Sequence, residues 1–367
     1  MIMKYKVLHC LAHMNRGGAE TLIMNIFRHI DRSEYSFSFL LAEGECDYKA
    51  EIEELGGTIY VVPGRSAGIV QYCRNLNDFF KEHRDEFDAV HYHTSSLSSL
   101  EVLYYARRHG IRKRIIHSHN TVQKGLLHNV LHWVQKPFLK LCATDYLACS
   151  QVAAKWLYEF TGALSESVVI NNGIDLSQFR FDPDNRRAVR EKYNIPASSL
   201  VVGHVGRFDT VKNHVFLLDV FNDFRRLHPD SYLICVGVGE LMDTVRSKVH
   251  DLGLQDKVIL AGLQKDVYKY LSSFDYLVFP SLYEGLPVAL VESQASGVMT
   301  VCSDKVSPEA KLTEYLSYFE LEKSPKEWAE CLNDTELLDR HEYTYGLTEK
   351  GYDIVHTVNY LTTEVYV

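Results

Sequence analysis

The sequence predicts an α/β fold built from two parallel sheets, each flanked by helices. Short apolar runs of strand length alternate with longer helical patterns along the whole chain, and this alternation is typical of parallel α/β construction. The chain has 367 residues, more than one ordinary hydrophobic core holds. The alternation also restarts near Leu200, after a polar stretch. We therefore expect two domains of similar construction.

The first series of elements supplies the first sheet. Its strands are predicted where β-branched, aromatic and leucine residues cluster between turn-forming residues. The predicted strands are 6–12, 37–42, 58–62, 89–93, 114–119, 145–149 and 168–171. Helices are predicted between them, for instance over 19–29 and 97–109.

The second series supplies the other sheet and a helical end of the chain. Its predicted strands are 201–206, 232–236, 258–261, 276–280 and 300–302. Helices are predicted over 212–227 and 288–296, and again after Lys323, where Pro325 suits a helix start.

A turn at Asn172-Gly173-Ile174-Asp175 and the charged stretch 180–190 are interpreted as the turn and linker between the domains. The expected boundaries are 1–172 for the first domain and 173–344 for the second. The last segment, 345–367, is expected to be able to pack back on the first domain.

Composition excludes several classes of protein. A net charge of −9 argues against a general electrostatic attraction to nucleic acid. The 8 cysteines include no Cys-x-x-Cys pair, so reduced thiols are expected. No apolar stretch reaches the length of a membrane span, and the first residues lack the core of a signal peptide. We expect a cytoplasmic protein that can touch a membrane.

Glu284 and Glu292 are the most informative residues of the second half. Glu284 follows an apolar strand, and Glu292 is a single acid in the apolar helix that begins after Pro287. Gly285 allows close approach of a ligand, and Pro287 suits the first helical position. The helix start presents free N–H groups and a positive dipole end, which favour phosphate. Glu292 needs a partner in apolar surroundings, and ribose hydroxyls would serve. The alternative is a structural pair in which Glu284 stabilises the helix start and Glu292 faces solvent.

A second motif runs from Gly203 to His214, at the end of a strand and the start of a helix, where ligands of open α/β sheets bind. Gly206 permits the turn, and Arg207 and Lys212 are cations that can hold a diphosphate. The alternative is a solvated pair of cations. The acidic pair in the same half favours the diphosphate.

Taken together, these motifs resemble the retaining glycosyltransferases of family 4, which have two Rossmann-like domains in the GT-B arrangement. The resemblance covers nearly the whole chain and is carried by Gly17-Gly18-Ala19-Glu20, by Asn171 to Asp175, by Gly206-Arg207-Phe208 and by Glu284 to Pro287. A weaker similarity, in residues 307–317, is to bacterial transferases of exopolysaccharide and capsule assembly.

The resemblance implies roles for individual residues. Arg207 and Lys212 would hold the donor diphosphate, Glu284 the transferred sugar and Glu292 the ribose. Gly285 and Leu286 would add backbone N–H contacts, and the main chain of Leu263 would meet the base. In the first domain, Gly17 and Gly18 would approach the donor, and His119 would reach its sugar. His119, Arg207, Lys212 and Glu284 are the residues expected to be catalytic.

The expected activity is transfer of a sugar from a nucleotide diphosphate donor, for which a UDP-sugar is preferred, to a lipid-linked or polysaccharide acceptor. Positive groups would stabilise the departing diphosphate, and neither a metal, a further cofactor nor a protein nucleophile is required. Two alternatives are retained. One is a non-hydrolysing nucleotide-sugar epimerase, and the other is a binding module that senses nucleotide sugar without turnover.

Histidine pairs and a glycine pair allow other interpretations. His91 and His93 share one face of a strand, as do His117 and His119, and such pairs could ligate zinc. The sequence identifies no further residues that would supply the third and fourth ligands of a zinc site, so no metal site is expected. Gly237-Val238-Gly239 lacks the third glycine of a dinucleotide fingerprint and is interpreted as a loop beside the donor pocket.

Residues 126–142 place apolar side chains at helical spacing, with Trp133, Lys136 and Lys140 among them and Lys124 just before them. The segment can be an amphipathic face on anionic lipid or can pack in the core, and core packing is preferred. A basic cluster at 107–108 and 112–114 is likewise interpreted as a solvated helix end.

Two positions depart from the pattern of the family. Asn213 stands where a glycine often follows the phosphate-binding lysine, and Val298-Met299 stands where a Gly-Leu-Pro or Gly-Ile-Pro run is frequent.

Overall fold

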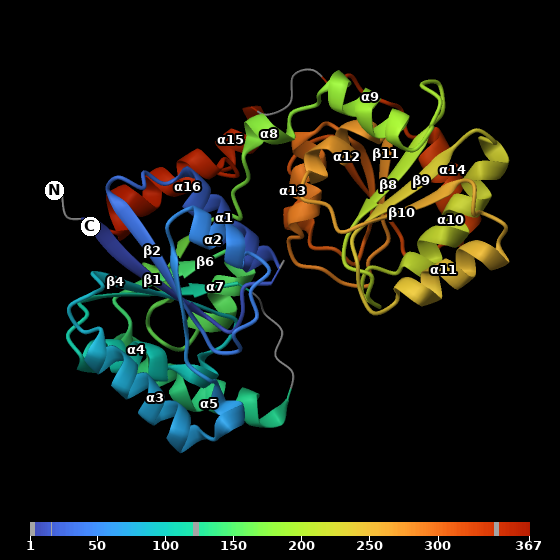
Figure 1. The fold of residues 1–367 in the computed structure, drawn as a ribbon. Helices are drawn as coiled ribbons and strands as arrows, with labels where there is room; N and C mark the ends of the chain where they lie inside the picture. Colours follow the sequence, from blue (N-terminus) through green and yellow to red (C-terminus); the bar gives the residue numbers. More distant parts are fainter. Residues whose placement is uncertain (1–3, 16, 120–124, 341–344) are drawn as a thin grey trace. The chain divides into compact units, whose positions relative to one another are not determined.

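A computed structural model describes residues 4–15, 17–119, 125–340 and 345–367 of the chain. The predicted α/β class with two Rossmann-like parallel sheets is confirmed (Figure 1). The chain forms two compact units, Met1–Gly173 with Asp353–Val367, and Ile174–Tyr352. The predicted boundary at residue 172 lies next to this division. The returning segment begins at Asp353 rather than at residue 345, so the short helix α15 (Tyr345–Glu349) belongs to the second unit.

The first unit holds a parallel sheet in the order β3-β2-β1-β4-β5-β6-β7. Its strands are β1 (Tyr5–Leu11), β2 (Tyr35–Leu41), β3 (Thr58–Val61), β4 (Ala89–Thr94), β5 (Lys113–Ser118), β6 (Asp145–Ala148) and β7 (Val168–Val169). Its helices include α1 (Gly18–His29), α2 (Lys49–Glu54), α3 (Ile69–Glu82), α4 (Glu101–Arg108), α5 (Leu126–Gln135), α6 (Leu139–Cys142), α7 (Gln151–Tyr158) and α16 (Ile354–Tyr360).

Alternation along the strands divides this core into two layers. Val7 and Ile115 pack with α1, α2 and α16 on one face of the sheet, whereas Leu8 and Ile116 pack with α3, α4, α6 and α7 on the other. Helix α16, red in Figure 1, lies beside the blue α1. The end of the chain therefore completes the apolar layer of the first unit.

The second unit repeats the plan with the sheet order β10-β9-β8-β11-β12-β13, again parallel. Its strands are β8 (Val201–Val205), β9 (Tyr232–Val236), β10 (Val258–Gly262), β11 (Tyr276–Phe279), β12 (Met299–Ser303) and β13 (Leu316–Phe319). Its main helices are α8 (Leu176–Phe179), α9 (Pro183–Lys192), α10 (His214–Leu227), α11 (Met242–Asp251), α12 (Val267–Ser273), α13 (Val288–Ala295) and α14 (Pro325–Asp334). Helices α8, α9, α12 and α13 cover one face, and α10, α11 and α14 cover the other.

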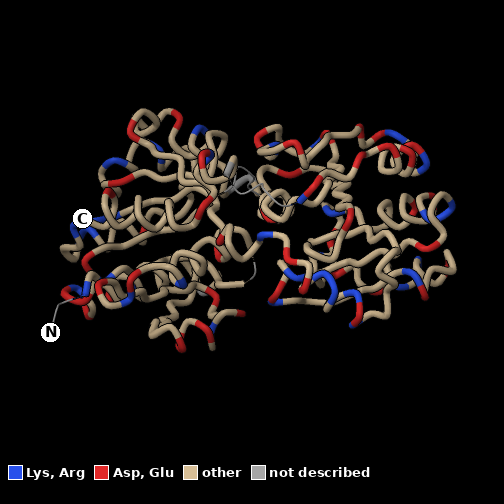
Figure 2. Tube along the Cα trace, turned by 90° about the horizontal axis from the view of Figure 1, so that it is seen from above, with Lys and Arg blue, Asp and Glu red and all other residues tan. Residues whose placement is uncertain are grey.

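Charged residues of both signs are scattered along the chain in both units (Figure 2). Neither sign is confined to one unit, which agrees with the modest net charge of −9. The distribution therefore points to local sites rather than to a general attraction for a polyanion.

Two predicted elements were wrong. The stretch 180–190, expected to be a linker, is largely the helix α9, because Asp182 caps its first turn at the Asp184 and Asn185 N–H groups and Pro183 occupies the first turn. The helix expected over 97–109 is broken at Leu100 into the 3₁₀ turn Leu97–Ser99 and α4.

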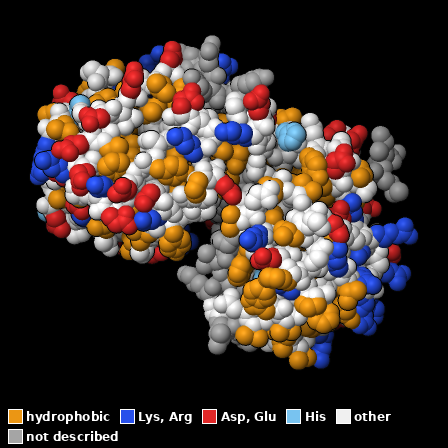
Figure 3. All heavy atoms as spheres, turned by 180° about the vertical axis from the view of Figure 1, so that it is seen from behind, with side chains coloured by type: hydrophobic (Ala, Val, Ile, Leu, Met, Phe, Trp, Pro, Cys, Tyr) orange, Lys and Arg blue, Asp and Glu red, His pale blue; other side chains and the backbone are white. Residues whose placement is uncertain are grey.

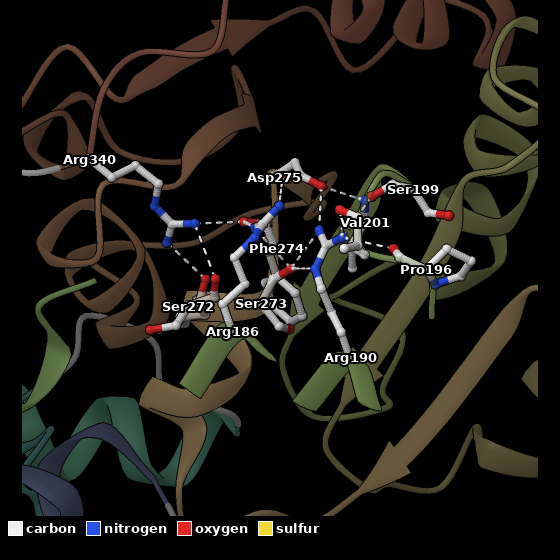
Figure 4. Close-up of polar contacts among 12 residues, drawn as sticks. Arg186, Arg190, Pro196, Ser199, Val201, Ser272, Ser273, Phe274, Asp275 and Arg340 are labelled. Atoms are coloured by element: carbon white, nitrogen blue, oxygen red, sulfur yellow. Dashed lines mark hydrogen bonds and ion pairs between the residues drawn. The ribbon is translucent and has the colours of Figure 1, made fainter. Parts of the chain in front are cut away.

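Burial of arginine explains why α9 is part of the second unit. Asp275, directly before β11, accepts hydrogen bonds from Arg186 Nη2 at 2.7 Å, Arg190 Nη2 at 2.8 Å and the Val201 N–H at 2.7 Å (Figure 4). The Arg190 side chain is only 4% exposed. Its remaining N–H groups reach backbone carbonyls at Ser199 and Ser273. One carboxylate thus joins α9 to the amino ends of β8 and β11.

Arg340 adds a second clamp at the same edge of the sheet. Its guanidinium donates to the carbonyl oxygen of Phe274 at 2.7 Å (Figure 4). It also donates to the Leu271 carbonyl oxygen at 2.9 Å and to Ser296. Burial lowers the pKa of Arg340 to about 9. Since that pKa is still above neutrality, the group remains charged, and carbonyl dipoles replace its water.

The Asp275→Asn variant is expected to lose about 3–5 kcal/mol of stability in the second unit, because Arg190 would keep a buried charge without its counter-ion. Hydrogen exchange of the β8 and β11 amides measures this unit alone. The control is Asp184→Asn, which removes an exposed ion pair with Arg187 and is expected to cost less than about 1 kcal/mol. Equal effects of the two variants would contradict the structural role of Asp275.

Candidate functional site

Lys212 and Glu284 form a direct ion pair at the carboxyl edge of the second sheet. The Lys212 Nζ atom lies 2.6 Å from Glu284 Oε1, and the side chains are only 14% and 19% exposed. The ammonium group also lies 4.4 Å from the centroid of the Phe279 ring, so a cation–π contact helps to hold it. The structure therefore brings together two residues that the sequence assigned to different parts of one ligand.

Local backbone geometry places Lys212 there. A Cβ atom at Gly206 would lie 3.1 Å from the Lys212 Cδ and Cε atoms, so glycine leaves room for the lysine side chain. Asn213 has φ 56° and ψ 43°, in the left-handed region, which glycine and asparagine adopt most easily. Asn213, which stands where the family often has glycine, can therefore adopt the same left-handed backbone conformation as glycine. Its Nδ2 donates to the Pro280 carbonyl at 3.2 Å, which ties the turn to the end of β11.

Arg207 is arranged differently from Lys212. Its side chain is 72% exposed and reaches Glu240 only at 3.5 Å. An ion pair of this kind contributes little to stability. The guanidinium is therefore available for an anionic ligand at small energetic cost.

The start of α13 has the properties expected of an anion site. Pro287 is the N-cap of this helix rather than its first residue, and no side chain caps the first turn. Among the described residues, none accepts a hydrogen bond from the N–H of Gly285 or Leu286. A Cβ atom at Gly285 would meet no atom within 4 Å, so protein packing does not require glycine there. These backbone donors and the helix dipole favour a negative group.

Glu292 lies one turn into α13 with part of its side chain accessible to solvent. Burial raises the pKa of its carboxyl group to about 7. Within the described ranges, no side chain or backbone N–H donates to this carboxyl group. A carboxyl group that is costly to ionise and lacks a partner is suited to accept hydrogen bonds from a ligand.

The loops after β9 and β10 border the same edge. A Cβ atom at Gly237 would lie 2.0 Å from the Gly206 carbonyl oxygen, and one at Gly239 would lie 2.4 Å from the Phe208 carbonyl oxygen. The two glycines are therefore required for packing against the turn that carries Arg207. Leu263 follows β10 and is 51% exposed.

The glycine motif of the first unit opens α1. Gly17 is the N-cap of α1, without a side-chain cap, and Gly18 is its first residue. A Cβ atom at Gly17 would lie 2.4 Å from Glu20 Oε2. Burial raises the pKa of Glu20, and His13 Nδ1 lies 3.3 Å from its Oε1. The glycine therefore leaves room for the partly buried Glu20 side chain as well as for an uncapped helix start.

His119 directly follows β5 in the first unit. Its Nε2 atom lies 2.8 Å from His93 Nδ1, and its Nδ1 atom is buried without a partner in the described structure. Burial lowers the pKa of His119 to about 3, so the imidazole is neutral near pH 7. Neither proton transfer to His119 nor a positive charge on it is favoured there.

The histidine pairs are closer together than the sequence indicated. In the groups His9, His91, His93 and His93, His117, His119, one ligand atom from each residue lies within 4.8 Å of the others. The argument that no third ligand is supplied was therefore wrong. Sequence reasoning missed His9, although alternation along 6–12 places it on one face with Val7.

The preference for core packing of residues 126–142 was wrong for several apolar side chains. Those that are half exposed are Val130, Trp133, Val134, Phe138 and Leu141. Phe138 and Leu141 line a cavity of about 490 Å³ together with Tyr104, Arg107 and Arg108. Figure 3 shows hydrophobic side chains gathered over the lower part of the first unit, with basic side chains at their margin.

Two models of known families match the two units. "Glycosyltransferase Family 4" matches residues 16–178, and "Glycosyl transferases group 1" matches residues 185–343. No described helix combines the length and apolarity needed to cross a membrane.

Individual relatives agree with these family models. The chain is 34% identical to the putative glycosyltransferase EpsF of Bacillus subtilis, over 97% of this chain and 95% of the relative. It is 25% identical to the capsular polysaccharide biosynthesis glycosyltransferase CapH of Staphylococcus aureus, over 98% of each chain. It is 27% identical to an Escherichia coli UDP-Gal:alpha-D-GlcNAc-diphosphoundecaprenol alpha-1,3-galactosyltransferase, over 65% of this chain and 64% of the relative.

A solved structure shares the whole fold. Anabaena HepE, crystallised with UDP and glucose, superposes with a TM-score of 0.77 over 98% of each chain at 18% identity. The family matches and the high coverage by EpsF agree with the motifs at Gly17, Arg207 and Glu284. The chain belongs to the family 4 glycosyltransferases, with the GT-B fold.

Proposed function

We propose that the chain is a retaining, metal-independent hexosyltransferase that moves a sugar from a UDP-sugar to a lipid-linked or polysaccharide acceptor. The observation that carries this proposal is the Lys212–Glu284 ion pair, 2.6 Å long, beside the uncapped start of α13. A cation, an acid and free backbone N–H groups then lie at one edge of one sheet. The E. coli relative named for its UDP-Gal donor and diphosphoundecaprenol acceptor supports both substrate classes.

The proposed mechanism follows from the movement of charge. Cleavage of the bond between the sugar and the diphosphate leaves positive charge on the sugar and negative charge on the diphosphate. Lys212, Arg207 and the start of α13 would stabilise the diphosphate, which makes a metal ion unnecessary. Glu284 would lie beside the sugar. The acceptor hydroxyl would attack on the face from which the diphosphate leaves, and a phosphate oxygen would take its proton.

The remaining predicted residues complete the proposed donor site. Glu292 would bind the ribose, Gly285 and Leu286 would donate backbone N–H groups, and the main chain of Leu263 would meet the base. In the first unit, Gly17, Gly18 and His119 are the residues proposed to act on the donor.

An epimerase is the enzymatic alternative, because it would use the same nucleotide-sugar site. It would need an acid and a base beside the anomeric carbon, and neutral His119 is poorly suited to either role. Incubation with UDP-sugar in the absence of acceptor separates the two, since an epimer would form only with the alternative activity. A binding module without turnover would form no epimer in this incubation and no transfer product when the acceptor is added.

We propose a cytoplasmic enzyme that contacts the membrane through the exposed apolar side chains of 130–141. Trp133 and Phe138 are 49% and 53% exposed. The exposed Arg108 lines the same cavity as Phe138, and Lys140 is exposed within the segment. Apolar side chains beside basic ones are suited to the interface of an anionic bilayer. Such a surface would bring a lipid-linked acceptor to the enzyme.

The Glu284→Gln variant is expected to lose transfer by roughly 100-fold, because the amide cannot stabilise charge on the sugar. UDP binding is expected to remain measurable, since Lys212 and Arg207 are unchanged. Initial rates and calorimetric titration with UDP measure the two properties. The control is Glu330→Gln, at an acid that is 52% exposed on α14, and unchanged transfer in Glu284→Gln would refute the role of Glu284.

Donor binding is expected to strengthen about tenfold between about pH 6 and about pH 8, because Glu292 ionises with a pKa of about 7. The sign follows from the ribose hydroxyls, which donate to the carboxylate and therefore favour its ionised form. UDP-glucose is the appropriate probe, since its diphosphate does not titrate in this range. Glu292→Gln is expected to remove the pH dependence, and a dependence that persists in this variant would contradict the assignment.

The double variant Phe138→Ser, Leu141→Ser is expected to lose binding to vesicles that contain anionic lipid, because each side chain would no longer bury apolar surface in the bilayer. Co-sedimentation at low and high salt measures binding. Val355→Ser is the matched control, because Val355 is 53% exposed on α16 and lies outside the apolar segment. Equal binding of all three proteins would exclude this membrane surface.

A further inference from the structure

A cavity of about 490 Å³ lies in the first unit, between α4 and the segment 135–142. We call it the α4 cavity. Its volume falls within the range of about 300–1,000 Å³ that is usual for small-molecule sites. The apolar part of its wall includes Leu100, Tyr104, Phe138 and Leu141. All of its lining residues belong to the first unit, so a ligand there needs no contribution from the second unit.

An amide and an acid in the wall already have protein partners. Gln135 Oε1 accepts a hydrogen bond from the Leu100 N–H group at 3.1 Å, and Gln135 Nε2 donates to the Ser98 carbonyl oxygen at 3.3 Å. Glu101 forms an ion pair with Arg65. Because the polar groups of both side chains are used in this way, a ligand in the cavity would gain mainly from apolar contact with the wall.

Two cations at the end of α4 also line the cavity. Arg107 and Arg108 are exposed residues in the last turn of this helix. Arg107 Nη1 donates to the Leu141 carbonyl oxygen, whereas Arg108 forms no hydrogen bond or ion pair with the part of the chain that the structure describes. A guanidinium carries five N–H donors, and its fork matches phosphate oxygens. The α4 cavity therefore combines an apolar wall with donors for a phosphate group.

The ligand that fits this combination is an amphiphile with a hydrocarbon chain and a negative head. Glu101 is neutralised by Arg65, so Arg107 and Arg108 give the wall a net positive charge. A soluble anion such as inorganic phosphate would leave the apolar wall unused, and a neutral hydrocarbon would leave the arginines unused. A phosphate attached to a hydrocarbon chain uses both, and anionic membrane lipids have this form.

The position of the arginines favours a bilayer phospholipid over the lipid-linked acceptor. The helix that connects two parallel strands runs opposite to them, so α4 begins at the carboxyl edge of the sheet and ends toward the amino edge. Arg107 and Arg108 are its last two residues, about 10 Å along the helix axis from Glu101. On the function proposed above, the reacting sugar lies at the carboxyl edge, where Gly17 and His119 follow their strands. A phosphate held by the two arginines would keep the sugar of an acceptor away from that edge.

We propose that the α4 cavity binds one anionic phospholipid of the bilayer. Its phosphate would lie on the two arginines, and an acyl chain would lie against Tyr104, Phe138 and Leu141. The choice of a phospholipid rests on the proposed function, which assigns the acceptor to the carboxyl edge. The bound lipid would hold the enzyme on the bilayer at a defined place, in addition to the apolar contact of 130–141. It differs from that contact because the acyl chain and the phosphate must belong to one molecule, bound in one copy per protein.

Calorimetric titration of the full-length protein with dihexanoyl phosphatidylglycerol, below the concentration at which this lipid forms micelles, tests the site in the absence of a bilayer. The expected result is saturable binding of one lipid per protein. Glycerol phosphate has the phosphate without the acyl chains and is expected to bind at least about tenfold more weakly. No saturable binding of the phospholipid, or equal binding of glycerol phosphate, would overturn the proposal.

Farnesyl diphosphate carries the prenyl diphosphate of a lipid-linked acceptor and tests the other source of such a ligand. The affinity for dihexanoyl phosphatidylglycerol is expected to be the same with and without farnesyl diphosphate, because the two compounds would not share the α4 cavity. A loss of phospholipid affinity when farnesyl diphosphate is present would assign the cavity to the acceptor and overturn the choice of a phospholipid.

Two substitutions test the two parts of the site. Arg108→Gln removes a phosphate contact but no bond of the described structure, and it is expected to weaken binding of dihexanoyl phosphatidylglycerol about tenfold. Tyr104→Ser, at a side chain that is 47% exposed, is expected to weaken it about fivefold through lost contact with the acyl chain. The matched control is Arg84→Gln, at an arginine of the first unit that is 66% exposed. Equal affinities of Arg108→Gln and Arg84→Gln would overturn the phosphate contact.

Co-sedimentation with vesicles of phosphatidylglycerol and phosphatidylcholine separates this site from the wider membrane surface. Vesicle binding without saturable binding of dihexanoyl phosphatidylglycerol would overturn the α4 site and leave the surface 130–141 intact. Saturable binding without vesicle binding would support the site and refute the wider surface. A protein that binds the phospholipid but transfers no sugar would refute the proposed transfer activity alone.

Discussion

All strands of each sheet run in one direction, and this constraint determines where chemistry can occur. In such a sheet every loop that leaves a carboxyl end emerges at the same edge. The turn with Arg207 and Lys212 follows β8, Leu263 follows β10 and Glu284 follows β11. In the first unit, Gly17 follows β1 and His119 follows β5. Residues far apart in the sequence therefore belong to one edge in each unit, without any special folding of the loops.

Much of the fold, and the positions of the loops that carry the proposed donor residues, could be predicted because the signals are local. Apolar runs bounded by turns indicated the strands, and Gly206 before Arg207 indicated a turn with a cation. The helix α9 was missed because its charged residues resemble a linker, although Asp182-Pro183 is a helix-start signal. Its burial depends on Asp275, which is 85 residues from Arg190, and a contact of that range leaves no local pattern.

Contacts and exposure that depend on the arrangement of whole elements were the hardest to predict. Alternation indicated that His91 and His93 share a face, but only the register of β1, β4 and β5 shows that His9 completes the cluster. The pairing of Lys212 with Glu284 was likewise not visible, because each residue had been assigned to the ligand. Exposure of Phe138 and Leu141 was missed because periodicity alone does not distinguish a core face from an exposed apolar face.

The clamp around Asp275 and Arg340 lies at the amino edge of the second sheet, whereas the residues proposed to bind the donor lie at its carboxyl edge. The two edges belong to the same strands. However, no side chain that anchors α9 is also one proposed to bind the donor. Exchange of whole loops after β9, β10 or β12 with those of relatives would therefore alter the surroundings of the donor while leaving the anchoring of α9 intact. The Gly237 and Gly239 positions would have to be kept in any such graft, because the backbone beside Arg207 leaves no space for a larger residue. If the second unit binds the donor as proposed, it is a scaffold on which donor preference can be re-engineered by loop exchange.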